Sequence, residues 1–557
     1  MRPVSAAHSA TADSATSRKR LVLVVAASSV GTVFEWYDFF IFGSLAAIIG
    51  RHFFAGAGRS QSYLFALLAF AAGFAVRPLG AVVFGWFGDR TGRKRTFLVT
   101  ISVMGAATFL VAVLPGQASI GLLAPFALVA LRMLQGFAIG GEYGGAAIYV
   151  AEHTIARRRG LATSWIQSSA ALGLALALIV ILGVRTALGE RTFAAWGWRV
   201  PFALSLLLLG VSLWIRLKLE ESPEFRRIQA EGALSRAPLA ESFLHWPNLR
   251  RVLTVLFAIL AGQGVVWYTA QFYSQFFLER VLSVPAATVN WLLLVATLAS
   301  APLYIAFGWL ADRIGRKPVM LFGLGLATLG FFPGFHWLTA AANPQLAQAS
   351  NDAPVVVVAP PADCSLQFDL IGTARTVTAC DLAKSALANR GVAYANRAAP
   401  AGAPTVILVG GRRIASVDAR ALAGPALARA KRDFESGLDA ALVAAGYPRT
   451  APRDRIDVAS TLAILMLFLV AAAALYGPQA AALVELFPVR IRYTALSVPY
   501  HIGVGWFGGF LPATAFAIVA ATGNIYAGLW YPVAVSALGF VVTLLFLPET
   551  LHRPSPP

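Results

Sequence analysis

Charged residues are scarce in this chain. Only 13% of its 557 residues are Asp, Glu, Lys or Arg, whereas 58% are hydrophobic, and soluble proteins average ~25% charged residues. This composition excludes a water-soluble enzyme and a disordered or fibrous chain. Cysteine is nearly absent too, because two residues exclude a disulfide scaffold or a multi-cysteine metal site. The net charge of +19 lies in short basic runs between apolar stretches, which indicates membrane topology rather than nucleic-acid binding.

Long apolar stretches are what the sequence has in abundance. A membrane-spanning helix needs ~20 predominantly apolar residues, and twelve stretches meet this: 21–49, 62–87, 96–116, 120–151, 160–184, 199–217, 252–278, 284–311, 318–341, 458–484, 494–522 and 525–548. Lys and Arg concentrate before the first span and in alternate loops, so the positive-inside rule predicts that both termini are cytoplasmic. We therefore expect an all-α, multi-pass protein of the cell inner (plasma) membrane.

The chain repeats itself at two offsets. The segment from Gly85 to Arg95 recurs from Gly308 to Pro318 with seven of eleven residues identical, at an offset of 223 residues. Glu152 and its neighbours recur around Glu485 at an offset of 333. We infer two six-helix pseudo-repeats, the second holding an insertion of about 110 residues between spans nine and ten. The predicted segments are a cytoplasmic tail (1–20), an N-terminal bundle (21–217), a cytoplasmic linker (218–251), a C-terminal bundle in two parts (252–341 and 458–550) and a periplasmic insertion (342–457).

The insertion reads as a small α/β module outside the cytoplasm. Strands are predicted at 355–359 and 405–409, and helices at 379–388 and 420–445. Residues 380–418 are faintly similar to a glutaredoxin in their order but lack a Cys-x-x-Cys pair. Both cysteines, Cys364 and Cys380, lie in this module, and we expect a structural disulfide rather than redox activity.

Five ionisable side chains are predicted to lie deep within spans: Glu35, Asp38, Arg77, Arg132 and Glu142. All belong to the first half, and such groups are functional candidates because they are costly in a bilayer. Three carboxylates against two arginines leave one negative charge uncompensated, so we assign proton coupling to the three acids. The arginines are candidates for anchoring a substrate carboxylate. The alternative is a charge network that only locks spans one, two and four together.

Other polar residues complete the candidate substrate site. Gln135 shares a helix face with Arg132, and Gln263, Trp267 and Gln271 repeat at four-residue spacing on span seven with Tyr268 beside them. This stripe lines a central cavity or, alternatively, makes interhelical hydrogen bonds. His336 and His501 are the only ionisable histidines of spans seven to twelve.

The duplicated motifs predict a gate at the cytoplasmic ends of the spans. Asp89 and Asp312 can cap helices and pair with arginines, while Glu152 is expected near Arg157 and Glu485 near Arg490. Weak surface ion pairs of this kind can still bias a rocking equilibrium. The full predicted gate comprises Asp89, Arg90, Arg93, Glu152, Arg157, Asp312, Arg313, Arg316, Glu485 and Arg490.

These motifs resemble those of a known family. The duplicated Gly-x-x-x-Asp-Arg-x-Gly-Arg-Lys pattern resembles the signature of the major facilitator superfamily. Finer marks are similar to its metabolite:proton symporter family: Phe34 to Phe40, Arg77 to Gly80, Arg132 to Gly136, Gly140 to Ala146 (with Tyr143), Trp198 to Phe202, Glu221 to Phe225 and Glu485 to Pro488. The resemblance implies uptake of small organic solutes with protons, with Glu35, Asp38, Arg77 and Arg132 in the transport pathway. The long insertion departs from the family pattern.

We therefore predict proton-coupled symport of a small organic acid by alternating access. The proton is the coupling ion, with no other cofactor and no metal, and the partners are a small solute and the lipid bilayer, not nucleic acid. We expect a monomer. Two alternatives remain: symport of a zwitterionic osmolyte such as proline or betaine, and a non-transporting membrane sensor that binds ligand through the insertion.

Overall fold

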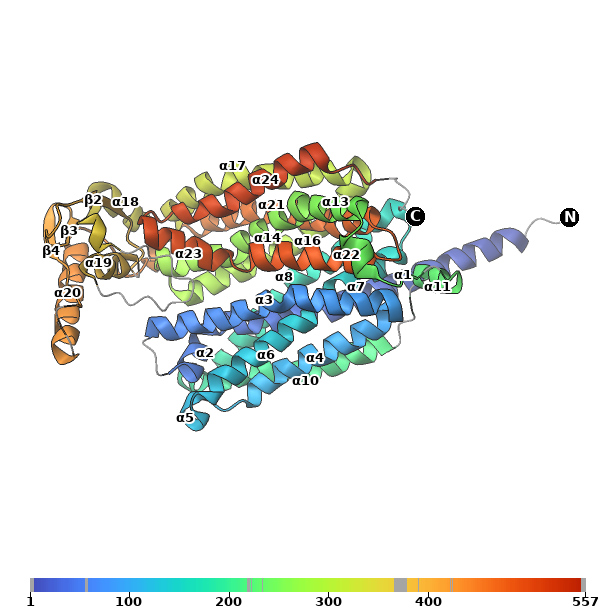
Figure 1. Cartoon of the computed structure of the whole chain (residues 1–557), viewed down its shortest axis with the longest axis horizontal. Coiled ribbons are helices and arrows are strands. Elements are labelled where there is room, and N and C mark those ends of the chain that lie inside the picture. The colour runs from blue at the N-terminus through green and yellow to red at the C-terminus, as the bar shows by residue number, and fades with distance from the viewer. Residues whose placement is uncertain are drawn as a thin grey trace.

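The chain forms two groups of long helices that run side by side, with a small α/β module at one end (Figure 1). The computed structural model describes residues 5–55, 59–217, 221, 223–232, 234–364, 378–388, 390–420, 422 and 424–551. The first half of the chain supplies one group and the second half the other. Both ends of the chain lie opposite the module (Figure 1), as an even number of crossings requires.

The N-terminal half contains these helices and helical turns: α1 (Ser5–Ser44), α2 (Ala46–Phe53), α3 (Arg59–Thr91), α4 (Arg93–Val113), α5 (Gln117–Ile120), α6 (Leu123–Ile139), α7 (Glu142–Glu152), η1 (Ala156–Arg158), α8 (Arg159–Leu188), α9 (Glu190–Thr192), η2 (Phe193–Gly197) and α10 (Arg199–Leu217). The linker to the second half forms α11 (Pro223–Ala230) and α12 (Pro238–Phe243).

The first span of the C-terminal half alternates between α-helix and wider π-helical turns. Another π-helical turn, η8, lies between α22 and α23 near the end of the chain. The elements of this half are α13 (Trp246–Val255), η3 (Leu256–Leu260), α14 (Ala261–Tyr268), η4 (Thr269–Tyr273), α15 (Ser274–Phe276), η5 (Phe277–Val281), α16 (Ala286–Ile314) and α17 (Arg316–Ala342), then, after the module, α21 (Val458–Leu486), α22 (Arg492–Tyr500), η8 (His501–Gly508), α23 (Leu511–Thr522), η9 (Ala527–Leu529) and α24 (Trp530–Phe546).

Ten helical stretches of the described chain are long and apolar enough to cross a membrane. They run over Leu68–Thr91, Lys94–Val113, Leu123–Glu152, Ala156–Leu188, Arg199–Leu217, Trp246–Val281, Ala286–Ile314, Arg316–Ala342, Val458–Leu486 and Ala527–Phe546. Each coincides with one of the predicted spans. The other two predictions, at 21–49 and 494–522, fall on α1–α2 and α22–α23, where some residues lie outside the described set. Large apolar side chains such as Phe126 and Leu329 remain exposed on the outside, as lipid-facing residues are.

Glycines let the two halves approach closely at the end where the duplicated motifs lie. α8 packs along α16, and α3 packs along α22. A Cβ atom on Gly308 of α16 would lie 2.6 Å from the Gly160 carbonyl oxygen of α8, so only glycine fits there. The repeated turns also match in backbone conformation, because Gly92 and Gly315 both have φ of 107°, which favours glycine.

The module consists of α18 (Pro344–Asp352), β1 (Val355–Ala359), η6 (Pro361–Asp363), α19 (Ala379–Ala388), β2 (Tyr394–Ala398), β3 (Val406–Val409), β4 (Arg412–Ala415), α20 (Gly424–Ala444) and η7 (Arg453–Arg455). Its strands form one sheet in the order β2-β1-β3-β4. β1 pairs in parallel with β2 and antiparallel with β3. A disulfide joins Cys364, after β1, to Cys380 at the start of α19.

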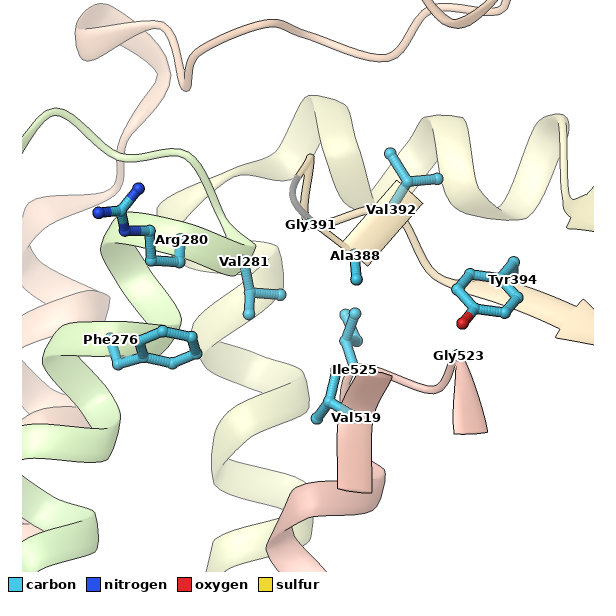
Figure 2. Close-up of a pocket in the computed structure, with 10 residues that line it drawn as sticks. All are labelled: Phe276, Arg280, Val281, Ala388, Gly391, Val392, Tyr394, Val519, Gly523 and Ile525. Atoms are coloured by element: carbon cyan, nitrogen blue, oxygen red, sulfur yellow. The ribbon is translucent and has the colours of Figure 1, made fainter. Parts of the chain in front are cut away.

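The module is attached to the outer ends of the C-terminal half. The Tyr394 amide donates to the Gly523 carbonyl over 2.9 Å, and the Ala451 amide donates to the Ser283 carbonyl over 3.0 Å. Between these contacts, apolar side chains converge from α19, from η5, from α23 and from the loop after α23, among them Val281 and Ile525 (Figure 2). These contacts join the module to the C-terminal half.

Candidate functional site

Two of the predicted acids share a single arginine that the sequence analysis did not count as buried. Arg216, on α10, forms ion pairs with Glu35 of α1 and, over 3.1 Å, with Glu142 of α7. Its side chain is only 3% exposed, and its guanidinium lies 4.1 Å from the centre of the Phe97 ring. Gly31 makes room for it, because a Cβ atom there would lie 2.8 Å from Arg216 Nη2. The cluster therefore ties spans one, four and six together.

This cluster corrects the predicted charge balance. The sequence analysis does not include Arg216 among the deep ionisable side chains, yet it lies buried at the end of span six. The first half therefore buries three arginines against the three predicted acids rather than two. Glu142 also belongs to a separate helix from Arg132, because the chain turns at Gly140 and Gly141 between α6 and α7.

Asp38 stands apart from these ion pairs. It is buried on α1, and its Oδ1 atom has no hydrogen-bond partner among the described residues. Its polar neighbours are Ser205 and Thr108, and no described arginine pairs with it. An ionised carboxylate buried without a cation is costly, so Asp38 differs in kind from Glu35 and Glu142.

The arginines of α3 and α6 are held by aromatic rings rather than by acids. The Arg132 guanidinium donates to Gln135 and lies 4.3 Å from the centre of the Phe42 ring. That of Arg77 lies between Phe39 and Phe74, at 4.3 and 4.2 Å from their ring centres. α3 and α6 come close enough for this because Gly136 packs directly on the α3 backbone.

Arg77 lies at the contact between the two halves. Tyr268 of α14, Tyr476 of α21, Tyr500 of α22 and His501 of η8 are all within electrostatic reach of its guanidinium. Its Nε and Nη2 atoms have no hydrogen-bond partner within the described chain. A buried cation with free donors and no ion pair to a described carboxylate is suited to an anionic ligand.

The stripe on span seven is divided between two roles. Trp267 donates from Nε1 to the Tyr304 hydroxyl over 3.1 Å, and Gln271 accepts from Thr297 over 3.1 Å. These are hydrogen bonds between spans seven and eight, the alternative that the sequence left open. Gln263 is buried with an unpartnered Oε1 atom, judged over the described residues. The side chain of Tyr143, the remaining predicted substrate contact, lies outside the described set.

The gate aspartates cap helices of the opposite half. Asp89, at the end of α3, accepts from the amides of Tyr493 and Thr494 over 3.2 and 2.9 Å and from the Thr494 hydroxyl over 2.8 Å. Asp312, at the end of α16, accepts from the amides of Gly160 and Leu161 over 2.9 and 2.7 Å. The two sites are related by the sequence repeat. Both interactions need the halves to be in contact at this end.

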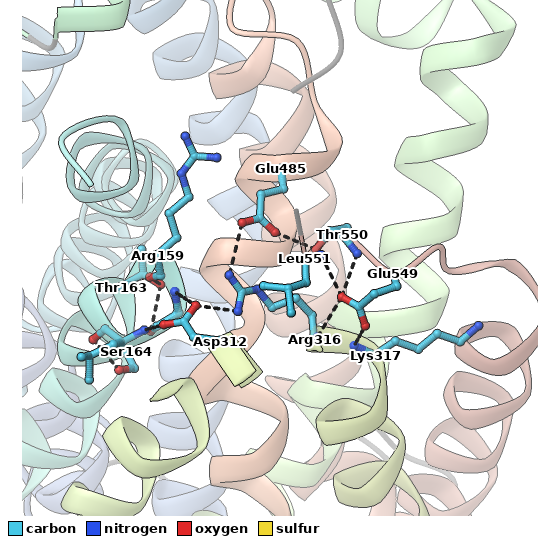
Figure 3. Close-up of polar contacts among 12 residues, drawn as sticks. Arg159, Thr163, Ser164, Asp312, Arg316, Lys317, Glu485, Glu549, Thr550 and Leu551 are labelled. Atoms are coloured by element: carbon cyan, nitrogen blue, oxygen red, sulfur yellow. Dashed lines mark hydrogen bonds and ion pairs between the residues drawn. The ribbon is translucent and has the colours of Figure 1, made fainter. Parts of the chain in front are cut away.

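The gate glutamates have partners other than the predicted ones. Glu152 pairs with Arg492 of the opposite half over 3.0 Å, where the sequence analysis expected Arg157. Glu485 pairs with Arg316 over 3.3 Å, and Arg316 also pairs with Asp312 over 2.6 Å (Figure 3). The predicted pairs were wrong because they joined glutamates to arginines close by in the sequence. In the structure, loops that are distant in the sequence come together and supply the arginines.

The other predicted gate arginines form no described ion pair between the two six-helix halves. Arg90 and Arg313 are exposed and lie over the rings of Trp86 and Trp309. Arg490 pairs with Glu241 of the linker over 2.5 Å. Arg157 is exposed and makes no ion pair within the described chain, and the Arg93 side chain lies outside that set.

Two further glutamates, which the sequence analysis did not assign to the gate, hold the motif turns. Glu549 accepts from the amides of Arg316 and Lys317 over 2.9 and 3.0 Å at the start of α17 (Figure 3). Glu221 accepts from the Lys94 amide over 3.2 Å at the start of α4. A carboxylate at a helix N-terminus is stabilising, so each half has a glutamate that caps the helix after its motif turn.

Comparison with known proteins gives the same architecture. The solved structure of the proton:xylose symporter XylE of the major facilitator superfamily, bound to 6-bromo-6-deoxy-D-glucose, superposes with a TM-score of 0.60 at 16% identity, covering 96% of this chain and 97% of that one. A partially occluded inward-open form of XylE from E. coli gives 0.58 at 14% identity, covering 96% and 99%. This likeness shows the fold.

The sequence comparisons show the family. Residues 23–244 and 439–555 match the family described as Sugar (and other) transporter. The shikimate transporter of Escherichia coli (strain K12) is 37% identical over 318 residues, which are 56% of this chain and 72% of that protein. The proline/betaine transporter of Salmonella typhimurium (strain LT2) is 33% identical over 313 residues, 55% and 62% of the two chains.

The fold and the duplicated motifs define a membrane transporter of the major facilitator superfamily, not an enzyme. The chain belongs to the Sugar (and other) transporter family within it.

Proposed function

We propose that this transporter takes up a small organic acid together with protons by alternating access. Twelve spans cross the inner membrane, both termini are cytoplasmic and the module is periplasmic. The unit is a monomer that needs no cofactor beyond the coupling proton and binds no nucleic acid. The observation that carries the proposal is Arg77, a buried cation between the halves that has unpartnered donors and pairs with no carboxylate of the described chain.

The substrate carboxylate binds Arg77 in this proposal. Arg77 lies beside Tyr268, Tyr500 and His501, which belong to the other half, so a bound anion contacts both rocking units. Substrates of the shikimate transporter and of the proline/betaine transporters, as their names give them, all carry a carboxylate. Arg77 can therefore bind the carboxylate of either relative's substrate, and the other residues of the site determine which substrate is selected.

Asp38 carries the proton in this proposal. Glu35 and Glu142 both pair with Arg216, whereas Asp38 has no described cationic partner. Because its ionised form is costly in this environment, a proton bound to Asp38 is the natural counter-ion to be carried with an anion.

A zwitterionic osmolyte is the second candidate, and one observation favours it. Trp36 and Phe40 of α1 stack with Trp267 of α14, with ring centres 5.2 Å apart between Trp36 and Phe40 and 5.8 Å between Phe40 and Trp267. Aromatic faces bind quaternary ammonium groups. In this conformation the rings pack on one another, so binding of the ammonium group between them requires the rings to separate.

A non-transporting sensor is disfavoured by the gate. The helix caps of Asp89 and Asp312 each join one half to the other, and a receptor that does not rock has no use for two matched contacts of this kind.

Uptake by purified protein in proteoliposomes tests the proposal. We expect organic acids to accumulate only with an imposed pH gradient, acidic outside, and counterflow to persist without one. Arg77→Gln should abolish both activities. Asp38→Asn should abolish uphill accumulation and spare counterflow. Arg429→Gln, which changes an exposed arginine of the module, is the matched control and should behave as the unaltered protein. Accumulation of solute by Asp38→Asn at the normal level would overturn the coupling assignment.

A further inference from the structure

His501 is a buried polar side chain whose ring nitrogens are unused. It is fully buried at the start of η8, and neither Nδ1 nor Nε2 makes a hydrogen bond of good geometry with a described residue, although the Gly140 backbone lies close to the ring. Neutral imidazole carries one donor and one acceptor, and leaving such groups buried and unpaired is unfavourable. The fold thus keeps an unsatisfied donor and acceptor in its interior, away from the ion pairs of the gate.

The position of His501 is set by close helix contacts. α14 crosses η8 at glycine pairs, where a Cβ atom on Gly264 would lie 2.8 Å from the Gly503 carbonyl oxygen. On the other side η8 packs against α3, and a Cβ atom on Gly505 would lie 3.8 Å from Arg77 Cδ. The π-helical turn, a form frequent at functional sites, therefore brings the imidazole of one half next to the guanidinium of the other.

The unpartnered polar atoms of this region belong to Arg77 of α3 and His501 of η8. Arginine offers donors, whereas a neutral histidine offers one donor and one acceptor. A plain carboxylate uses only donors. An acceptor beside the anion site is satisfied by a ligand that also presents a hydrogen-bond donor, such as a hydroxyl group.

We propose that His501 recognises a hydroxyl group of the substrate next to the carboxylate held by Arg77, so that the site selects hydroxylated carboxylates. This inference rests on the proposed function and names its substrate class. His501 acts here as a specificity residue that the C-terminal half contributes. A ligand held by both halves also links recognition of the hydroxyl to closure of the site.

Counterflow in proteoliposomes with matched ligand pairs tests this role. The pairs are shikimate against cyclohexene carboxylate, and malate against succinate, which differ in hydroxyl groups but share a carboxylate. The unaltered protein should prefer the hydroxylated member of at least one pair by about tenfold or more, since a site built around a hydroxyl penalises its loss. His501→Phe should reduce this preference about tenfold while transport of the deoxygenated member is kept.

Two further variants keep the test decisive. His501→Gln retains a donor and an acceptor and should preserve part of the preference even if the phenylalanine variant does not fold. His336→Phe changes the exposed histidine of the same half and should leave the preference unchanged. No preference in the unaltered protein, or an equal loss for both members of a pair in the His501 variants, would overturn the inference alone. Absence of counterflow with every carboxylate would instead overturn the proposed function.

Discussion

Replacing Asp89 by Asn should open the motif-bearing end of the transporter. The carboxylate accepts three hydrogen bonds from the start of α22, at 3.2, 2.9 and 2.8 Å. Asparagine keeps one acceptor oxygen and turns an NH₂ group toward a donor, so at least one charge-assisted bond is lost. Such a bond contributes ~1.5–3 kcal/mol, and the lost charge at the helix N-terminus adds ~0.3–1 kcal/mol. A net loss of ~2 kcal/mol shifts a two-state equilibrium about 30-fold.

A thiol reporter on the other side of the gate measures this shift. The two native cysteines are joined to each other, so Ser164→Cys introduces the sole free thiol. Ser164 is fully buried on α8 and packs against Gly308, a contact that Asp89 does not make. A membrane-impermeant maleimide should therefore label it about 30-fold faster in the Asp89→Asn background. Asp418→Asn, an acid of the module that pairs with Arg420, is the matched control.

The refuting result is specific. An unchanged labelling rate at position 164 would mean that the helix cap does not bias the rocking equilibrium. If a reporter at Ser497, on α22 itself, accelerated while position 164 did not, the substitution would only loosen α22 locally. Either outcome would remove Asp89 from the gate.

Three more substitutions have expected outcomes. Arg216→Gln leaves two buried acids unpaired and should cost ~3–5 kcal/mol, seen as a lower melting temperature in detergent that Glu142→Gln partly restores; no change would mean the cluster is not structural. Cys364→Ser opens a disulfide loop with a sequence separation of 16 and should cost the module ~3 kcal/mol, seen as faster proteolysis with counterflow retained. Gly308→Val places side-chain atoms where a Cβ already lies 2.5 Å from α8 and should abolish counterflow, whereas Gly210→Val, which has open space around it, should not.

The sequence predicted well what depends on local pattern. The strand at 355–359 and the helix at 379–388 have the bounds that the structure gives them, because the strand is a short run of apolar β-branched residues and the helix has an apolar face. β2 and β4 were missed because their side chains are mostly exposed and lack an apolar face to reveal them. Repetition in the sequence also revealed the two halves, because equivalent turns require glycine at the same motif position.

The pairing of side chains could not be predicted in the same way. Arg216 follows an apolar run, as a loop residue would, and only the packing of α1 and α7 against its helix makes it a buried cation. Glu221 and Glu549 brace equivalent turns yet are 328 residues apart, an offset that matches neither repeat spacing. Such ion pairs and helix caps join residues that are far apart in the sequence. They depend on how the helices pack, which cannot be predicted from the spacing of residues along the chain.

The attachment of the module has a practical consequence for imaging. Because it is bound through Tyr394 and Ala451 to one rocking unit, it reports the orientation of that unit outside the membrane. An antibody fragment directed at α20, on the far side of the module from the spans (Figure 1), would give a small particle the asymmetric feature that electron cryo-microscopy needs for alignment. The angle between this feature and the micelle would then distinguish the two states of the transport cycle without any chemical cross-link.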